Sequence, residues 1–167
     1  MKMIAAADRK GGIGKNGQLL AHLPGDMKYF RETTAGAVVV MGRKTLESFP
    51  GGRPLKGRRN LVISRTLSPG AQEGVEVCRS VEEAVELASR ESDRDVFVIG
   101  GGEIYNLMLP YCEEAYITEI DAVLDADTFI PVFAELPEWE CSSRSPEKEE
   151  NGLKYVFAVY RRKGNGS

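Results

Sequence analysis

The chain has 167 residues, of which 42% are hydrophobic and 28% are charged, and its formal net charge is −3. A chain of this length forms one domain that can bury about 70% of its unfolded surface. The composition argues against disordered and collagen-like proteins, and the small negative charge argues against a nucleic-acid partner.

Cysteine usage and the N-terminal residues indicate a cytoplasmic protein without a membrane partner. The three cysteines, Cys78, Cys112 and Cys141, are widely spaced, which fits neither a disulfide framework nor a metal-binding CxxC pair. No metal is therefore expected. The first residues turn polar after a short apolar run, and no run reaches membrane-spanning length. Residues 161–167 predict a polar tail, in which Asn165-Gly166-Ser167 matches a glycosylation sequon without consequence in the cytoplasm.

Short runs rich in valine and isoleucine predict seven strands, and segments between several of them predict helices. The expected strands are 3–7, 37–41, 61–64, 75–78, 96–99, 115–120 and 155–160. The expected helices are 25–34, 43–49, 80–90 and 102–109. The third helix is the best marked, because Ser80 and Glu83 form a capping box.

Strands that alternate with helices predict an α/β fold with a central, mostly parallel sheet and helices on both faces. The uninterrupted apolar run from Val38 to Met41 agrees, since such strands are buried on both faces. The last two apolar runs are separated by a polar stretch, 121–151, without a helix. An antiparallel C-terminal strand pair is therefore expected. No linker or repeat divides residues 1–167, which we expect to form a single domain.

Ligands of such folds bind beyond the carboxyl ends of the strands. Residues 8–17 follow the first strand, are rich in glycine and predict a mobile loop. The segment is not a phosphate loop, because Asn16 follows Lys15 where a hydroxyl is required. It is either a lid over a bound ligand or an ordinary surface loop.

The next helix places a carboxylate beside an apolar surface. Asp26 lies four residues before Phe30, and Met27 lies three before it, so one flank presents all three side chains. A carboxylate accepts two parallel N–H bonds from an amidine-like edge, which suits a flat heterocycle. The alternative is an acid that only complements the helix dipole.

Two strand ends carry cations beside hydroxyl groups. Gly42 is followed by Arg43, Lys44 and Thr45 at the start of a helix, where backbone N–H groups attract phosphate. A second strand ends in Ser64-Arg65. Together they suggest a dinucleotide with a 2′-phosphate, hence NADP over NAD. Solvated surface arginines are the alternative.

A buried strand at 96–99 runs into Gly100-Gly101-Gly102, where glycines let the backbone approach a ligand closely. It is not a dinucleotide-binding GxGxxG fingerprint, because Tyr105 occupies the position of the third glycine. A tight turn without a ligand is the competing interpretation.

Together these segments resemble dihydrofolate reductase from Ile4 to about Tyr160. The resemblance rests on Ile13-Gly14, Leu23-Pro24-Gly25-Asp26, residues 40–49, Arg53-Pro54-Leu55 with Arg58-Arg59-Asn60, residues 98–105 and Asp127-Thr128. It implies reduction of 7,8-dihydrofolate to 5,6,7,8-tetrahydrofolate, with NADPH as the cofactor that supplies hydride to C6 while a proton reaches N5.

The resemblance also assigns the substrate site. Asp26 is expected to be the catalytic carboxylate that holds the 2-amino and N3 edge of the pterin, with Thr118 supporting it. Arg58 is expected to pair bidentately with the α-carboxylate of the glutamate tail. The walls around the substrate are expected to be Ile4, Ala5, Met27, Phe30, Phe49, Ile99 and Tyr105.

On the cofactor side, the resemblance implies four groups of residues. The nicotinamide is expected to lie against Ala6, Ile13, Gly14 and Leu19. The pyrophosphate and adenosine ribose are expected at Gly42, Arg43, Lys44 and Thr45, and the 2′-phosphate at Ser64 and Arg65. Gly101, Gly102, Glu103, Ile104 and Tyr105 complete the cleft. Gly100-Gly101 resembles the family's cis glycine pair.

Two departures from the family stand out. Leu20-Ala21 replaces the usual Pro-Trp, so the indole that borders the substrate and positions a water is missing. Glu103 places an acid near the expected pyrophosphate. His22, the only histidine, is expected to be a solvated loop residue, and Trp139, the only tryptophan, is expected to be structural.

Two other functions fit parts of the chain. A riboflavin-pathway pyrimidine reductase of the same fold would share the NADPH half, but its substrate lacks the glutamate tail that Arg58 would bind. A flavodoxin-like receiver domain needs clustered acids at adjacent strand ends, and the second strand here ends in Met41-Gly42. A monomer is the expected oligomeric state.

Overall fold

A computed structural model describes residues 1–164 of the chain. The predicted sequon at Asn165-Gly166-Ser167 lies outside these residues. Within them, no helix combines the length and the apolar character that a membrane crossing requires.

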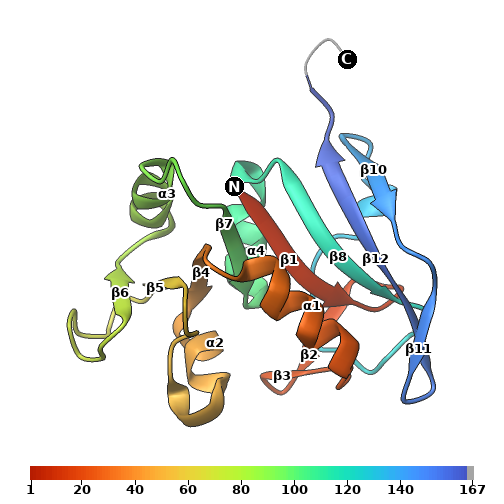
Figure 1. Ribbon diagram of the computed structural model, residues 1–167, viewed down its shortest axis with the longest axis horizontal. Helices are drawn as coiled ribbons and strands as arrows, with labels where there is room; N and C mark the ends of the chain where they lie inside the picture. The colour runs from red at the N-terminus through yellow and green to blue at the C-terminus, as the bar shows by residue number, and fades with distance from the viewer. Residues whose placement is uncertain (165–167) are drawn as a thin grey trace.

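The described residues form a large sheet whose strands run in the order β10-β12-β8-β1-β7-β4-β5-β6, with β11 paired to β12 (Figure 1). Its strands are β1 (Lys2–Ala7), β4 (Val38–Gly42), β5 (Arg59–Ile63), β6 (Val75–Cys78), β7 (Val96–Gly100), β8 (Glu114–Ile120), β10 (Trp139–Arg144), β11 (Lys148–Glu150) and β12 (Leu153–Arg162). The strands from β8 to β6 pair in parallel. The partners of β12 are antiparallel to it, which confirms the predicted C-terminal pairing.

Helices cover both faces of the sheet, as predicted. They are α1 (Pro24–Thr34), α2 (Arg43–Ser48), α3 (Val81–Ser89) and α4 (Gly102–Met108), with short 3₁₀ segments at η1 (Pro50–Gly52), η2 (Leu109–Tyr111) and η3 (Phe133–Glu135). Alternate residues of β4 reach the two sides, since Val38 and Val40 join the cluster under α3 and α4, whereas Val39 and Met41 join that under α1 and α2. An uninterrupted apolar strand is the result of this double burial.

The glycine-rich segment after β1 differs from its prediction. It contains β2 (Gly12–Lys15), which pairs with the following β3 (Gln18–Leu19) on one side and with β9 (Thr128–Phe129) on the other in a second sheet. The hairpin turns at Asn16 and Gly17, whose φ angles of 52° and 76° match the turn that Asn-Gly favours between antiparallel strands. The expectation of a mobile loop is therefore wrong over these strands.

The C-terminal strand also extends beyond its prediction. The prediction of a polar tail from residue 161 is wrong at its first two positions, because Arg161 and Arg162 belong to β12. Arg161 lies 3.2 Å from the carboxylate of Glu114, and the Arg162 guanidinium lies 4.5 Å from the centre of the Trp139 ring. These contacts hold two cations in a strand that hydrophobicity alone does not reveal. Trp139 is buried against Phe133, as a structural residue is expected to be.

A buried carboxylate anchors the β2 hairpin. Asp8 is 6% exposed, and its oxygens accept backbone N–H bonds from Lys10 at 2.9 Å, Gly12 at 2.8 Å and Leu124 at 2.9 Å. The first two follow β1 and the third precedes β9, so one side chain joins both connections. Removal of the acceptor leaves N–H groups unsatisfied.

We expect Asp8→Ala to lower the free energy of unfolding by about 3 kcal/mol, because a charged acceptor of several hydrogen bonds is lost. Urea titration followed by circular dichroism measures this loss. Asp93→Ala is the matched control, since Asp93 is exposed, and it is expected to change stability by less than about 0.5 kcal/mol. Equal effects of the two substitutions would contradict the anchoring role of Asp8.

Candidate active site

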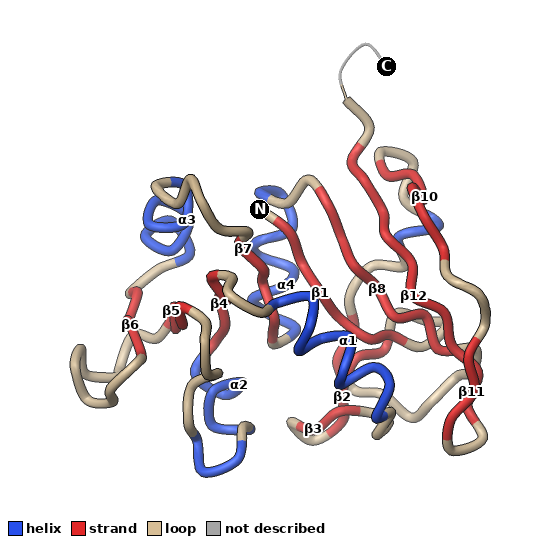
Figure 2. Tube along the Cα trace, in the orientation of Figure 1, coloured by secondary structure: helices blue, strands red, loops and turns tan. Residues whose placement is uncertain are grey.

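The predicted motifs meet at one edge of the sheet. Gly42 ends β4, Ser64 follows β5 and Gly100 ends β7, and β4 lies between the other two strands. Figure 2 shows α2 and the β2–β3 hairpin at this edge and α3 at the opposite one. The candidate site therefore lies at the carboxyl ends of the parallel strands, where ligands of such sheets bind.

Asp26 lies in the first turn of α1, which begins with Pro24 at its first position. The hydroxyl of Thr118, on β8 and 2% exposed, donates a hydrogen bond to Asp26 Oδ1 at 2.5 Å. Burial raises the pKa of Asp26 above its ordinary value; the Thr118 hydrogen bond opposes this rise, and the negative charge of Glu150 adds to it. The site thus holds a carboxyl group that keeps its proton to higher pH than a free aspartate.

Several predicted wall residues gather in one apolar cluster. Ile4, Phe30, Phe49 and Ile99 belong to one apolar cluster, and Met27 remains 43% exposed. Ala5 packs against the cluster on the other face, so the structure does not bring it together with those four. Ala6 is paired in register with Thr118, which places it beside the partner of Asp26.

Tyr105 is a buried member of the predicted ligand residues. Its ring is buried, and its hydroxyl donates to the backbone oxygen of Ile4 at 2.6 Å. Burial raises the pKa of this phenol. Its hydrogen-bonding group is therefore already used to join α4 to β1.

Arg58 lies half-buried beside the far end of α1. It donates to Thr34 Oγ1 at 3.3 Å and to the Lys56 oxygen at 3.1 Å, and no carboxylate pairs with it within residues 1–164. Burial and the nearby positive charge of Arg31 lower the pKa of Arg58. Among residues 1–164 neither guanidinium group has an acid partner, so both can donate charge-assisted hydrogen bonds to an anion. Arg31 was missed from sequence, although a cation in the last turn of the Asp26 helix was a usable signal.

Two helix starts face the same edge. Gly42 and Gly101 are the N-caps of α2 and α4, and neither helix has a side-chain cap. A Cβ on Gly42 would lie 3.1 Å from Ile104 Cγ1, and one on Gly100 would lie 3.3 Å from Thr45 Oγ1. Glycine therefore lets the two helix starts approach closely. The Gly100–Gly101 peptide bond is cis, as the resemblance implies.

Cations surround these helix starts. Arg43 is exposed and lies 3.3 Å from Glu47, whereas the exposed Lys44 and Arg65 have no acid partner in the described part of the chain. Ser64 is buried, and its hydroxyl accepts N–H bonds from the two residues that follow Arg65. Glu103 is exposed in the first turn of α4.

Arg79 is a further cation that sequence reasoning missed. It follows β6, and its Nη1 donates to the backbone oxygens of Ser64 at 3.0 Å and Leu67 at 2.7 Å. The guanidinium therefore holds the connection that presents Ser64 and Arg65. Its position after a strand end was the available signal.

The β2–β3 hairpin closes against the start of α4. A Cβ on Gly102 would lie 3.7 Å from Ile13 Cδ1, so these two residues are adjacent. Gly14 pairs with Leu19 on one side and with Thr128 on the other. The Asn16 backbone N–H donates to Asp127 at 2.9 Å, which binds the hairpin turn to the β9 segment. Leu19 remains 73% exposed.

The segment between this hairpin and α1 shows the departure from the family. Ala21 packs against Leu23 and Ile120 in a small apolar cluster, where no indole is available. His22 is exposed, as predicted, and its backbone oxygen accepts a hydrogen bond from Asn151 at 2.8 Å.

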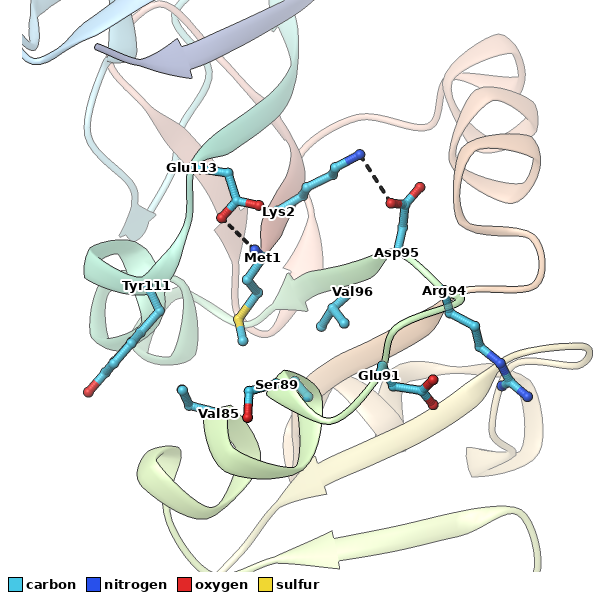
Figure 3. Close-up of a pocket in the computed structure, with 11 residues that line it drawn as sticks. Met1, Lys2, Val85, Ser89, Glu91, Arg94, Asp95, Val96, Tyr111 and Glu113 are labelled. Carbon is cyan, nitrogen blue, oxygen red and sulfur yellow. Dashed lines mark hydrogen bonds and ion pairs between the residues drawn. The ribbon is translucent and has the colours of Figure 1, made fainter. Parts of the chain in front are cut away.

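A cavity of about 350 Å³ lies at the opposite edge, where β1 and β7 begin (Figure 3). Four of its charged groups form two pairs, since the Met1 ammonium contacts Glu113 and Lys2 Nζ lies 3.3 Å from Asp95. None of the predicted site residues lines this cavity. It is therefore separate from the candidate active site.

Fold and site together define an α/β protein with a mostly parallel sheet. The carboxyl edge of this sheet combines a carboxyl group with a raised pKa, cations that have no acid partner in the described part of the chain, and two helix starts without a side-chain cap. A family model described as dihydrofolate reductase matches residues 1–162. The chain belongs to the dihydrofolate reductase family.

Named relatives agree with this assignment. The chain is 40% identical to dihydrofolate reductase type 3 of Salmonella typhimurium, over 97% of this chain and 98% of that protein. A solved structure of dihydrofolate reductase from Enterococcus faecalis, complexed with NADP(H) and RAB-propyl, has a TM-score of 0.82 at 34% identity and covers 98% of this chain and 96% of its own.

Other relatives are longer. The bifunctional dihydrofolate reductase-thymidylate synthase 2 of Arabidopsis thaliana is 40% identical over 96% of this chain, which spans 31% of that protein. The comparisons favour dihydrofolate reductases over the riboflavin-pathway alternative.

Proposed function

We propose that this protein reduces 7,8-dihydrofolate to 5,6,7,8-tetrahydrofolate with NADPH. The balance requires one hydride at C6, one proton at N5 and release of NADP⁺. One observation carries the proposal. The Asp26 carboxyl, which accepts a hydrogen bond from Thr118 and has a raised pKa, lies at the same edge of the sheet as Lys44 and Arg65, which have no acid partner among residues 1–164. Family membership supports the same reaction.

Asp26 is the catalytic residue in this proposal. Its carboxylate accepts the parallel N–H groups of the pterin 2-amino and N3 edge. Because burial raises its pKa, the carboxyl stays protonated to higher pH and so favours proton delivery toward N5. Thr118 orients the carboxyl by its hydrogen bond.

The remaining substrate contacts follow from the positions of the side chains. Ile4, Phe30, Phe49 and Ile99 form the apolar wall, and the exposed Met27 borders the substrate from the first turns of α1, whereas the Ala5 side chain packs on the other face of the sheet. Arg58 binds the α-carboxylate of the glutamate tail, and Arg31 adds a second positive charge beside it. Tyr105 acts indirectly, through the Ile4 backbone.

The cofactor edge fits NADPH, since the two helix starts at Gly42 and Gly101 have no side-chain cap and leave backbone N–H groups for a phosphate. Gly42, Arg43, Lys44, Thr45 and residues 101–105 border the pyrophosphate and ribose. Ser64 and Arg65 bind the 2′-phosphate, supported by Arg79. Ala6, Ile13, Gly14 and Leu19 border the nicotinamide, which supplies the hydride when bound.

The same proposal covers cell compartment, domain and assembly. Cys78, Cys112 and Cys141 are free thiols, and burial raises the pKa of Cys78 to about 11 and of Cys112 to about 12. Free thiols, two of them buried with raised pKa values, suit the reducing cytoplasm. The family match over residues 1–162 supports one reductase domain.

Large exposed apolar side chains occur on separate elements, which supports a monomer.

The direct test is NADPH oxidation by the purified chain, followed by absorbance with and without dihydrofolate. We expect oxidation to require dihydrofolate, to proceed much more slowly with NADH, and to be inhibited competitively by a folate analogue. Absence of dihydrofolate-dependent oxidation, despite measurable NADPH binding, would overturn the proposed reaction.

The 2′-phosphate site predicts one selective defect. Arg65→Gln is expected to raise KM for NADPH roughly tenfold and to leave KM for NADH unchanged, because one charge-assisted hydrogen bond to the phosphate is lost. Arg94→Gln is the matched control, since Arg94 is exposed at the opposite edge. A parallel loss for both cofactors would contradict a phosphate-specific role of Arg65.

A further inference from the structure

Glu150 connects the C-terminal hairpin to the helix that carries Asp26. It ends β11, and the chain turns at Asn151 and Gly152 into β12 (right-hand side of Figure 1). Glu150 Oε1 accepts the backbone N–H of Gly25 at 2.8 Å and the hydroxyl of Tyr155 at 2.6 Å. One carboxylate oxygen therefore joins α1, β11 and β12.

The contact requires glycine at position 25. A Cβ there would lie 2.6 Å from the Tyr155 hydroxyl and 2.8 Å from Glu150 Oε1, both closer than real Cβ atoms approach. A second hydrogen bond, from Asn151 Nδ2 to the His22 oxygen at 2.8 Å, joins the same two segments. The start of α1 is thus bound to the hairpin on both sides of Leu23.

This carboxylate replaces a missing helix cap. The N-cap residue of α1, Leu23, makes no side-chain hydrogen bond, so the first-turn N–H groups have no local acceptor. Glu150 supplies the acceptor from another element and places a negative charge at the positive end of the helix. The Gly25 N–H that it binds belongs to the residue directly before Asp26.

We propose that Glu150 is a positioning residue for Asp26. The Glu150 carboxylate fixes the first turn of α1, which carries Asp26, and places a negative charge near the Asp26 carboxyl. This inference rests on the proposed role of Asp26 in dihydrofolate reduction. The two hydrogen bonds of Glu150 go to Gly25 and Tyr155, and neither of these residues is Asp26 or a predicted ligand residue.

The charges around the two carboxyls define the expected pH effect. Asp26 faces Thr118 on β8, Tyr29 on its own helix, Tyr105 on α4, Tyr155 on β12 and Glu150 on β11. The hydrogen bonds that Glu150 accepts from Tyr155 and Gly25 lower its pKa, and its neighbours His22 and Lys148 lower it further, so Glu150 is negative near neutral pH.

The direction of the effect follows from this charge. The negative Glu150 raises the pKa of Asp26, so its neutralisation lowers that pKa and leaves less Asp26 protonated near neutral pH. A reaction that consumes a proton then slows near neutral pH. The alkaline decline of the rate moves to lower pH.

The test compares three variants by the pH dependence of kcat and of kcat/KM for dihydrofolate. Glu150→Gln keeps an oxygen acceptor for Gly25 and Tyr155 but loses the charge, and it is expected to shift the alkaline decline to lower pH with little change in the acid plateau. Glu150→Ala also loses the acceptor and is expected to lower the plateau roughly tenfold, because a small displacement of a catalytic group costs up to about 100-fold. Glu149→Gln, which removes the same charge from the exposed neighbour, is expected to retain the original profile.

Two further measurements separate the possible failures. NADPH binding and unfolding midpoints of Glu150→Gln establish that the variant is folded, and repetition in a His22→Gln background excludes histidine as the source of the shift. A Glu150→Gln profile that superimposes on that of Glu149→Gln overturns the positioning role. Full activity of Asp26→Asn would instead overturn the proposed function of Asp26.

Discussion

Asp26→Asn is expected to lower kcat for dihydrofolate by about 100- to 10,000-fold near neutral pH, the range that a positioned acid or base contributes. Asparagine keeps the shape and still accepts a hydrogen bond from Thr118, but it has no proton to deliver and no charge to hold the pterin edge. NADPH affinity is expected to remain unchanged, because the cofactor residues lie on other elements. Steady-state kinetics and a fluorescence titration with NADPH measure the two quantities.

The pH profile of this variant gives a second check. The remaining activity is expected to rise steadily toward low pH, where solvent protonates the substrate, without the decline that ionisation of Asp26 causes. Turnover within about threefold of the original protein would refute the catalytic role, since it would correspond to less than about 1 kcal/mol in the barrier.

The same substitution is expected to stabilise the fold at neutral pH. The native pKa of Asp26 is raised above its ordinary value of 3.8, so below that value both folded and unfolded states are protonated and stability is unaffected. As pH rises through the native pKa, the buried carboxylate acquires a desolvation cost that the unfolded state does not bear. Asparagine carries no such cost, and a higher midpoint of thermal unfolding is expected above that pH but not below 3.8.

Arg58→Lys is expected to raise KM for dihydrofolate by roughly 10- to 100-fold with a smaller effect on kcat. The planar guanidinium binds a carboxylate through two parallel N–H bonds, whereas an ammonium group offers a point charge. Arg58 lies beyond the far end of α1 from Asp26, so the loss is one of binding and not of chemistry.

A truncated substrate provides the control for this prediction. A dihydropterin without the glutamate tail is expected to react equally with the original protein and with Arg58→Lys. Arg90→Lys, at the exposed C-cap of α3, is expected to leave the kinetics of both substrates unaffected. An equal rise in KM for the tailed and tailless substrates would place the glutamate carboxylate elsewhere.

Strand and helix positions were predictable where one physical signal dominated. The apolar run of β4 is buried on both faces, and Ser80 caps α3 by accepting the Glu83 N–H at 3.1 Å. The edge strands β10 and β11 escaped prediction because their residues are mostly exposed and carry no apolar alternation. The β2–β3 hairpin escaped because its glycines were interpreted as a mobile loop, although Asn16-Gly17 is a strong hairpin turn.

The candidate site divides in the same way. Asp26 and Thr118 are 92 residues apart in the chain, and periodicity alone offers no reason to pair them; only the resemblance did so, and the hydrogen bond is present. Glu150, Arg31 and Arg79 were missed because a charge in a polar segment usually faces solvent. Their importance depends on tertiary neighbours such as Gly25 and Ser64, which sequence spacing does not reveal.

The strand order also determines when the chain can fold. β1 is synthesised first, yet Lys2 pairs with Phe97 on one side and with Glu114 on the other. β8 in turn needs β12, where Tyr155 pairs with Ile120. A nascent chain therefore carries β1 with unpaired edges until residues 97 and 114 have been made, and β8 with one open edge until residue 155 follows. Such non-local pairing slows folding and prolongs the exposure of unpaired strand edges.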